Sequence, residues 1–206
     1  MEALSPMLEL ETPRGPARVH VQPARDAWAA LVLGHGAGGG IGAPDLVAAA
    51  DAAREASVAV ALVEQPYRVA GRRSPAPAAQ LDEAWISVLE QLRAGELGDL
   101  PIIVGGRSSG ARVACRTVAA TGAAGVVCLA FPLQPPGRAS APSRLPELDA
   151  VSVPTLVVQG ERDPFGIPRA SGSRSVVLVP GDHSLRAAPA VKEAVRAWLD
   201  ALGAAG

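Results

Sequence analysis

Lysine, aromatic residues and cysteine are all scarce in this chain of 206 residues. Lys192 is the single lysine among 19 basic residues, and its distance from every glycine-rich stretch excludes a phosphate-binding loop that ends in lysine. Because the formal net charge is only −1, we expect no binding of nucleic acid and no binding to an anionic membrane. Aromatic residues make up 3% of the chain, too few to line a long acyl-chain pocket.

Cysteine and long apolar runs are also limited. Cys115 and Cys128 lie in apolar surroundings without metal-ligand spacing, so we expect reduced core thiols, a reducing compartment and no metal site. No window approaches the roughly 20 apolar residues of a membrane-spanning helix. Residues 1–13 contain acids and prolines without a basic start, so no signal peptide is expected. The prediction is therefore a cytoplasmic protein.

Apolar residues make up 49% and charged residues 19% of the chain, which is typical of a globular protein of one domain, residues 1–206, with 1–16 irregular. Continuous apolar runs alternate with stretches of helical period. This pattern predicts an α/β domain with a mostly parallel sheet of about 6–7 strands and helices on both faces. The expected strands are residues 29–33, 58–63, 101–104, 126–131, 153–158 and 175–179, with 17–21 as an edge strand, and the expected helices are 44–56, 77–94, 109–121 and 189–202.

Ligands of an open α/β sheet bind at the carboxyl ends of its strands, so the residues that follow each strand are of interest. The sequence GGRSSGAR, residues 105–112, follows the third expected parallel strand. Asp163 follows the fifth and His183 the sixth. A serine, an acid and a histidine are thus expected at one edge of the sheet, in the chain order Ser, Asp, His.

Ser108 is a better nucleophile candidate than Ser109. A nucleophile elbow requires very small residues two places before and after its serine, and Ser108 has Gly106 and Gly110 there. The corresponding neighbours of Ser109 include Arg107, which would crowd the turn. The backbone N–H of Ser109 is instead expected to donate to an oxyanion. A plain glycine–serine turn is the alternative.

His183 is the preferred general base, because His20 lies on the expected edge strand and His35 lies in a glycine-rich loop upstream of Ser108. Asp163 is the preferred acid, because it lies in a turn directly after a strand, whereas Asp182 is adjacent to His183 in sequence and poorly placed to reach its imidazole. Asp149 and Glu147 fall in a proline-rich loop and are less favoured, as is Glu161.

Two further groups of residues are expected near this edge. The loop at residues 34–40 holds five glycines, which would let the backbone N–H of Ala37 or Gly38 reach the oxyanion. Tyr67, Arg72 and Arg107 are the candidate substrate-binding residues, with an arginine pairing a substrate carboxylate. The alternatives are that the arginines form a solvated rim and that Tyr67 packs the loop.

Residues 132–152 are expected to form a proline-rich loop over the active-site edge, and their prolines preclude a long helix that could act as a lid there. We therefore expect an open site for short acyl groups, with activity on small esters or thioesters.

These stretches together resemble the α/β-hydrolases, and more narrowly the small, lidless, dienelactone-hydrolase-like subfamily. Animal relatives of that group include testis-expressed proteins and subunits of histone-acetyltransferase complexes. The resemblance implies a serine hydrolase with Ser108, Asp163 and His183 as its triad, working without metal or organic cofactor. Two departures are Ser109, where many relatives have methionine, and Gln134, where they often have histidine. The matching stretches are residues 34–39, 65–67, 70–73, 105–112, 131–132, 135–137, 158–160, 163–166 and 181–184.

The predicted partner is a small-molecule ester or thioester, and a homodimer stays open. A different class of function is a weakly active or inactive scaffold built on the same fold, because some relatives are of this kind.

Overall fold

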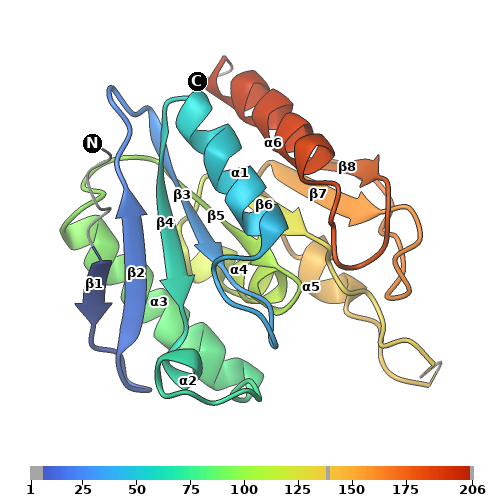
Figure 1. Ribbon diagram of the computed structural model, residues 1–206, viewed down its shortest axis with the longest axis horizontal. Helices are drawn as coiled ribbons and strands as arrows, with labels where there is room; N and C mark the ends of the chain where they lie inside the picture. Colours follow the sequence, from blue (N-terminus) through green and yellow to red (C-terminus); the bar gives the residue numbers. More distant parts are fainter. Residues whose placement is uncertain (1–6, 138–139, 205–206) are drawn as a thin grey trace.

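The computed structural model describes residues 7–137 and 140–204. Within them, eight strands form one sheet in the order β1-β2-β4-β3-β5-β6-β7-β8 (Figure 1). The pairs β1–β2 and β2–β4 are antiparallel, and all the other neighbouring pairs are parallel. The strands are β1 (Met7–Leu10), β2 (Ala17–Gln22), β3 (Ala29–Gly34), β4 (Val58–Glu64), β5 (Ile102–Arg107), β6 (Gly125–Leu129), β7 (Thr155–Gly160) and β8 (Arg174–Val179).

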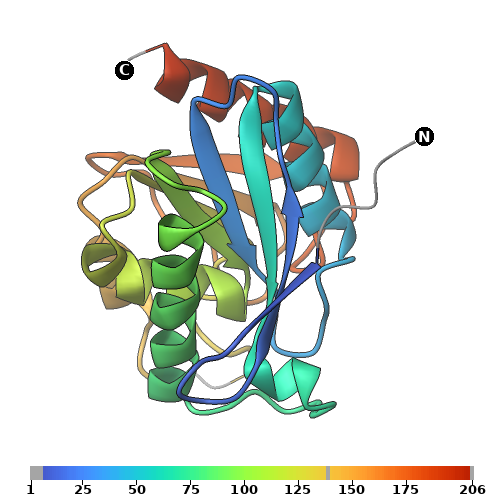
Figure 2. The same cartoon turned by 90° about the vertical axis from the view of Figure 1, so that its left-hand side faces the viewer.

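Helices cover both faces of the sheet, as Figure 2 shows in a view along its edge. α1 and α6 pack on one face, while α3 and α4 pack on the other. Proline at the first turn of α1 and of α6 fixes a backbone angle that suits a helix start. The helices are α1 (Pro44–Glu55), α2 (Pro66–Val69), α3 (Ala78–Ala94), α4 (Ser109–Thr121), α5 (Leu145–Asp149) and α6 (Ala188–Gly203).

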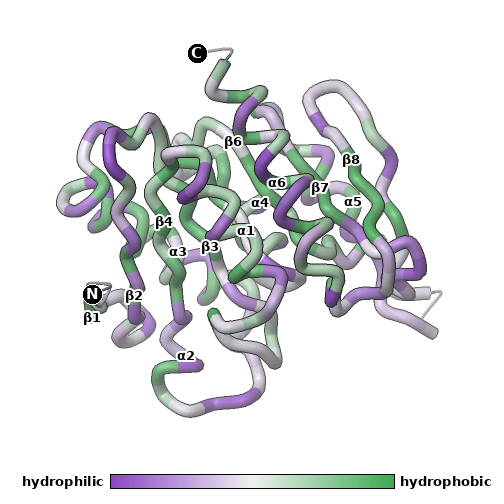
Figure 3. The backbone as a smooth tube through the Cα atoms, turned by 45° about the horizontal axis from the view of Figure 1, so that its top comes forward, coloured by the Kyte–Doolittle hydropathy of each residue, from purple (hydrophilic) through white to green (hydrophobic). Residues whose placement is uncertain are grey.

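The central strands are buried on both sides, which explains their continuous apolar sequences. Every residue of β3 and of β7 is buried, and Figure 3 shows the strands as the apolar centre of the molecule. Alternate side chains of these strands enter two separate cores. Leu31 and Leu33 pack with α1 and α6, whereas Val32 packs with α3 and α4. The sheet therefore lies between two layers of helices, with one apolar core on each of its faces.

The parallel strands end together at one edge of the sheet. Gly34 at the end of β3 lies beside Gly106 of β5, and Gly160 of β7 lies beside Val179 of β8. The loops that follow these strands consequently start at the same level. This register is what brings the candidate residues, far apart in sequence, to one place.

The sequence-based prediction of the fold class, a mostly parallel sheet with helices on both faces, is confirmed, but the number of strands is eight rather than 6–7. The extra strand is β1, within residues expected to be irregular, so β2 is paired on both sides and is not an edge strand. Two short helices were also missed. α5 lies inside the stretch expected to be a loop, and α2 follows β4.

The connection between β6 and β7 is the position at which a lid was considered. Its described part contains one five-residue helix, α5, and no other helix. Pro132 and Leu133 of this connection pack down at the sheet edge, where Leu133 touches the apolar core. The described residues thus form no helical roof over the carboxyl edge.

Candidate active site

Ser108 lies in a sharp turn between β5 and α4. Its backbone φ of 50° and ψ of −104° are strained for a residue with a side chain. The backbone N–H of Ser108 still donates to the carbonyl of Leu129 on β6, and its carbonyl accepts from Arg112 in the first turn of α4. The turn is therefore held from the sheet and from the helix, with the serine at its tip.

Gly106 and Gly110 permit this turn because β3 passes very close to it. A Cβ atom at Gly106 would lie 2.4 Å from the carbonyl oxygen of Gly34, and one at Gly110 would lie 2.3 Å from the same atom. No rotamer relieves such a contact, since the obstacle is backbone. Small residues on both sides of Ser108 are thus a steric requirement, as the sequence predicted.

His183 brings its imidazole to Ser108 from the loop between β8 and α6. Its Nε2 lies 3.0 Å from the Ser108 Oγ, and its Nδ1 lies 2.8 Å from the Asp163 Oδ2. The ionised carboxylate can only accept, so Nδ1 carries the proton and Nε2 is free to accept from the serine hydroxyl. The imidazole is 17% exposed, whereas the carboxylate of Asp163 is fully buried. This arrangement can remove a proton from Ser108 and store it on the imidazole.

Asp163 is fixed by two further donors in the turn after β7. The side-chain amide of Gln159 lies 2.7 Å from its Oδ2, and the backbone N–H of Phe165 donates to its Oδ1 at 2.9 Å. Gln159 is itself buried and also contacts the carbonyl oxygens of Phe131 and Gly166. Together with His183, these donors give the carboxylate three hydrogen bonds, which hold it toward the imidazole.

The aromatic ring of Phe165 lies against the imidazole of His183, with 4.2 Å between the ring centroids and 33° between the planes. This contact restricts rotation of the imidazole about its side-chain bonds. Phe165 also lines an open pocket of about 360 Å³. The other lining residues come from the two loops that meet there and are Gln134, Pro135, Pro136, Gly137, Pro164 and Gly166.

The other acidic candidates make different contacts. The side chain of Asp182 is exposed and accepts hydrogen bonds from the backbone and hydroxyl of Ser184, which lower the pKa of its carboxyl group. Asp149 forms an ion pair with Arg174, and Glu147 forms ion pairs with arginines of α4. Among the described residues, none of these three carboxylates contacts an imidazole, in contrast to Asp163.

His35 lies under the glycine-rich loop rather than at the serine. Its Nδ1–H donates to the carbonyl of Gly36 at 2.8 Å, and its Nε2 accepts the backbone N–H of Gln65 at 3.1 Å. Burial lowers the pKa of His35. The neutral ring thus joins the loop after β3 to the end of β4. His20 lies on β2, with its Nε2 3.5 Å from the Oε2 of Glu64.

Ala37 and Gly38 follow His35 at the carboxyl edge of β3. Within the described residues, no acceptor is found for the backbone N–H of either residue, and the carbonyl of Ala37 accepts the Tyr67 hydroxyl at 3.0 Å. Ser109 is the first residue of α4, so its N–H has no acceptor inside the helix. The structure brings these N–H groups to the same edge as Ser108.

The three expected substrate-binding residues have different surroundings. Tyr67 is buried and holds the carbonyl of Ala37, so its hydroxyl supports the loop. Arg72 is exposed and lines a cleft of about 90 Å³ together with Tyr67, Gln80 and Arg14. Arg107 points inward, where its guanidinium contacts Asp45 and the carbonyl of His183.

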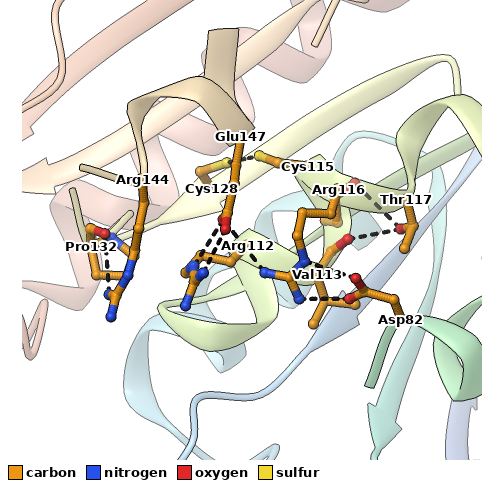
Figure 4. A network of polar contacts seen from close by, with 11 residues as sticks. Asp82, Arg112, Val113, Cys115, Arg116, Thr117, Cys128, Pro132, Arg144 and Glu147 are labelled. Carbon is orange, nitrogen blue, oxygen red and sulfur yellow. Dashed lines mark hydrogen bonds and ion pairs between the residues drawn. The ribbon is translucent and has the colours of Figure 1, made fainter. Parts of the chain in front are cut away.

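A second polar cluster connects α4 to α3 and α5 (Figure 4). Arg116 donates to Asp82 of α3 at 2.6 and 2.8 Å, and Arg112 donates to Glu147 of α5 at 2.5 and 2.8 Å. Arg116 also lies 3.4 Å from Glu147. These contacts connect three helices and include none of the candidate catalytic side chains.

Sequence reasoning missed Gln159, Phe165 and Asp45 as parts of this site. Gln159 and Phe165 do lie in stretches that resemble the hydrolases, residues 158–160 and 163–166, and this resemblance was the available signal. Asp45 had no such signal, because an aspartate in the first turn of a helix is common.

Two searches of the described residues concern metals and membranes. No group of three or more His, Cys, Asp or Glu side chains in residues 7–137 and 140–204 is arranged to hold a metal ion. Over the same residues, no helix combines the length and apolar character needed to cross a membrane.

Comparison with known proteins gives a consistent result. Residues 27–198 match the sequence model of a family described as an alpha/beta hydrolase domain. No curated protein matches the chain.

Solved structures with low sequence identity share the fold over nearly the whole chain. A lidless α/β serine hydrolase from Xanthomonas campestris is 21% identical, with a TM-score of 0.71 and 96% of each chain covered. A dienelactone hydrolase from Anabaena variabilis is 16% identical, with a TM-score of 0.73 over 95% of this chain and 94% of that one. Est1E from Butyrivibrio proteoclasticus is 14% identical, with a TM-score of 0.74 over 96% of this chain and 99% of that one.

Proposed function

Because the chain belongs to the alpha/beta hydrolase domain family, we propose that it is a serine hydrolase that cleaves small esters or thioesters through an acyl-enzyme. The observation that carries the proposal is the continuous chain of contacts from the Ser108 Oγ through the His183 imidazole to the buried carboxylate of Asp163. Three groups in this order activate a serine for attack on a carbonyl carbon.

In the proposed reaction, His183 Nε2 takes the proton of Ser108 as the hydroxyl oxygen attacks the carbonyl carbon. Asp163 keeps the proton on Nδ1 and stabilises the imidazolium ion. The protonated imidazole then gives its proton to the leaving alcohol or thiol, and the acyl group stays on the serine. His183 next removes a proton from water as the water attacks the acyl-enzyme. The imidazole then returns this proton to the Ser108 oxygen as the acid is released.

The oxyanion formed in both halves of the reaction needs hydrogen-bond donors. We assign this role to the backbone N–H of Ser109 and of Ala37 or Gly38. These groups are supported by the strained turn at Ser108 on one side and by Tyr67 and His35 on the other. A donor lost from such a site costs about 10²- to 10³-fold in kcat.

The proposed substrates have short acyl chains. The connection between β6 and β7 holds one five-residue helix in its described part, so little apolar surface is available to bury a long chain. Each added CH₂ group contributes about 0.8 kcal/mol only when it is buried.

We assign any contact with a substrate carboxylate to the exposed Arg72 rather than to Arg107, whose guanidinium is already paired. An acidic ester and its neutral isostere should therefore differ in KM for the unaltered protein, and this difference should vanish in Arg72→Met.

Hydrolysis of p-nitrophenyl esters tests the proposal. The kcat/KM should be highest at about two to four acyl carbons, and a burst of p-nitrophenol should show the acyl-enzyme. A continued rise of kcat/KM through eight or more carbons would contradict the short-chain assignment. Absence of turnover on every ester and thioester would favour a scaffold built on the same fold.

We also propose that the protein works in the cytoplasm as a protein with reduced thiols. The support is that Cys115 and Cys128 are free and buried, with their sulfur atoms 3.5 Å apart. Such a pair persists as thiols where the surroundings are reducing. The protein should be purified rapidly without reductant, unfolded and then alkylated. Two alkylated cysteines are expected, and a disulfide between them would contradict the assignment.

A further inference from the structure

Arg107 occupies the position directly before Ser108, as the last residue of β5. Its side chain turns away from solvent and is 20% exposed. One nitrogen, Nη2, donates to the backbone carbonyl of His183 at 3.1 Å, and another, Nε, lies 3.1 Å from the Oδ2 of Asp45. The planar guanidinium thus connects the strand that bears Ser108 to the loop that bears His183.

Asp45 is the anchor of this connection. It is fully buried in the first turn of α1, where its Oδ1 accepts the backbone N–H of Leu46 at 3.0 Å. Burial raises the pKa of Asp45, and the positive charge of Arg107 acts in the opposite direction. Among the described residues, no other cationic side chain forms an ion pair with this carboxylate. Arg107 therefore offsets the cost of burying a charge that nothing else there neutralises.

Gly36 makes room for the guanidinium. A Cβ atom at Gly36 would lie 2.9 Å from the Nη1 of Arg107 and 3.6 Å from its Cδ. The loop that carries the proposed oxyanion donors therefore packs directly on this side chain. Three segments of the site, after β3, β5 and β8, consequently meet at one guanidinium.

The imidazole of His183 is held by Asp163 and Phe165, but its backbone needs a separate support. Within the loop, the backbone N–H of Leu185 donates to the carbonyl of Asp182. The backbone N–H of Arg162 donates to the carbonyl of Gly181. Among the described residues, Arg107 is the one whose side chain donates to the carbonyl of His183. A planar fork bound at two ends restricts both position and orientation.

We infer that Arg107 is a positioning residue that, with Asp45 as its buried anchor, fixes the backbone of His183 relative to Ser108. The inference rests on the proposed function. It differs from substrate recognition by Arg107, because both ends of its guanidinium bind groups of the protein itself. Loss of a hydrogen bond from a charged donor, together with a shift of the imidazole, should lower kcat by about 10- to 100-fold.

The two roles separate in the kinetics of Arg107→Met. A positioning residue affects the transition state, so kcat should fall equally for an acidic ester and its neutral isostere, with each KM changing by less than about twofold. A substrate-binding residue would instead raise KM for the acidic ester alone. That second pattern would overturn the inference.

A matched control and two companion variants exclude a general loss of stability. Arg116 is 18% exposed, lies on α4 and pairs with Asp82 rather than with any group of the proposed site, so Arg116→Met should keep the kcat of the unaltered protein. Arg107→Lys keeps the charge without the planar fork and should recover part of kcat. The double variant Asp45→Asn/Arg107→Met removes the unpaired buried carboxylate, so it should recover thermal stability relative to Arg107→Met without recovering kcat. Recovery of kcat together with stability would show a merely structural role.

Amide hydrogen exchange tests the connection independently of any activity. Peptides that cover residues 181–186 should exchange at least about tenfold faster in Arg107→Met than in the unaltered protein, and no faster in Arg116→Met. Unchanged exchange in this loop would overturn the inference even if the protein hydrolyses esters. Faster exchange in a protein without esterase activity would instead locate the failure in the proposed function.

Discussion

Arg107 comes directly before Ser108 in the chain, while Arg112 and Arg116 follow it on α4. The guanidinium of Arg107 contacts the fully buried carboxylate of Asp45 and the backbone carbonyl of His183. The other two contact partly exposed carboxylates of α3 and α5 (Figure 4). Arg107 thus connects segments that carry the proposed catalytic groups, whereas Arg112 and Arg116 connect α4 to α5 and α3. Residue type alone does not separate these roles; the partners do.

The largest expected effect comes from the nucleophile itself. Ser108→Ala should lower kcat by about 10⁶-fold, because the remaining groups have no hydroxyl to activate. Ser109→Ala is the matched control, since the proposed oxyanion donor of Ser109 is its backbone N–H. Steady-state kinetics on a short-chain ester measure both variants. A larger loss in Ser109→Ala would move the nucleophile by one residue.

The acid of the triad should give the next largest effect. Asp163→Asn should lower kcat by about 10⁴-fold, because an amide at this position favours the wrong imidazole tautomer. Asp182→Asn should leave kcat nearly unchanged, since that carboxylate contacts Ser184 rather than His183. The reverse order of the two variants would assign the acid to Asp182.

The network on α4 should matter for stability and not for rate. Arg116→Met removes both hydrogen bonds to Asp82 and should lower the free energy of unfolding by about 1–3 kcal/mol. Urea unfolding measures this loss, and kcat per folded molecule should stay constant. A loss of kcat in Arg116→Met without a loss of stability would mean that the arginines of α4 also support the catalytic step, as is proposed for Arg107.

The smallest expected effect concerns the pH dependence of stability. Burial lowers the pKa of His35, so the unfolded chain takes up a proton first as the pH falls below the ordinary imidazole value of about 6.5. The stabilisation is present above that value and is lost as the pH falls through the lower folded value. The melting temperature should therefore fall less steeply between pH 7 and 5 in His35→Gln than in the unaltered protein.

An unchanged slope of melting temperature against pH in His35→Gln would contradict this assignment, because the pH dependence would then arise outside the loop after β3.

The sequence was informative where local sterics or regular burial decide the structure. Gly106 and Gly110 predicted a sharp turn centred on Ser108, and the approach of Gly34 permits no side chain at either glycine. The strands β3 to β8 were predicted because their apolar residues are continuous. β1 was missed because its residues are only partly buried at the sheet edge, where the apolar signal is weak.

Contacts between distant segments could not be predicted in the same way. Asp45 and Arg107 are separated by more than a strand and a helix, and only the parallel register of β3 and β5 brings them together. Gln159 reaches Asp163 because the chain reverses after β7, which the sequence shows only as a turn. Long-range polar pairs of this kind carry no periodic signal.

Reaction with a fluorophosphonate, followed by peptide mapping, tests the central claim most directly. The reagent captures a serine only when a neighbouring base activates it, so the account predicts a single adduct on Ser108. The adduct should be absent in Ser108→Ala, retained in Ser109→Ala and formed far more slowly in Asp163→Asn. An adduct on another residue, or no adduct on a folded protein, would contradict the account.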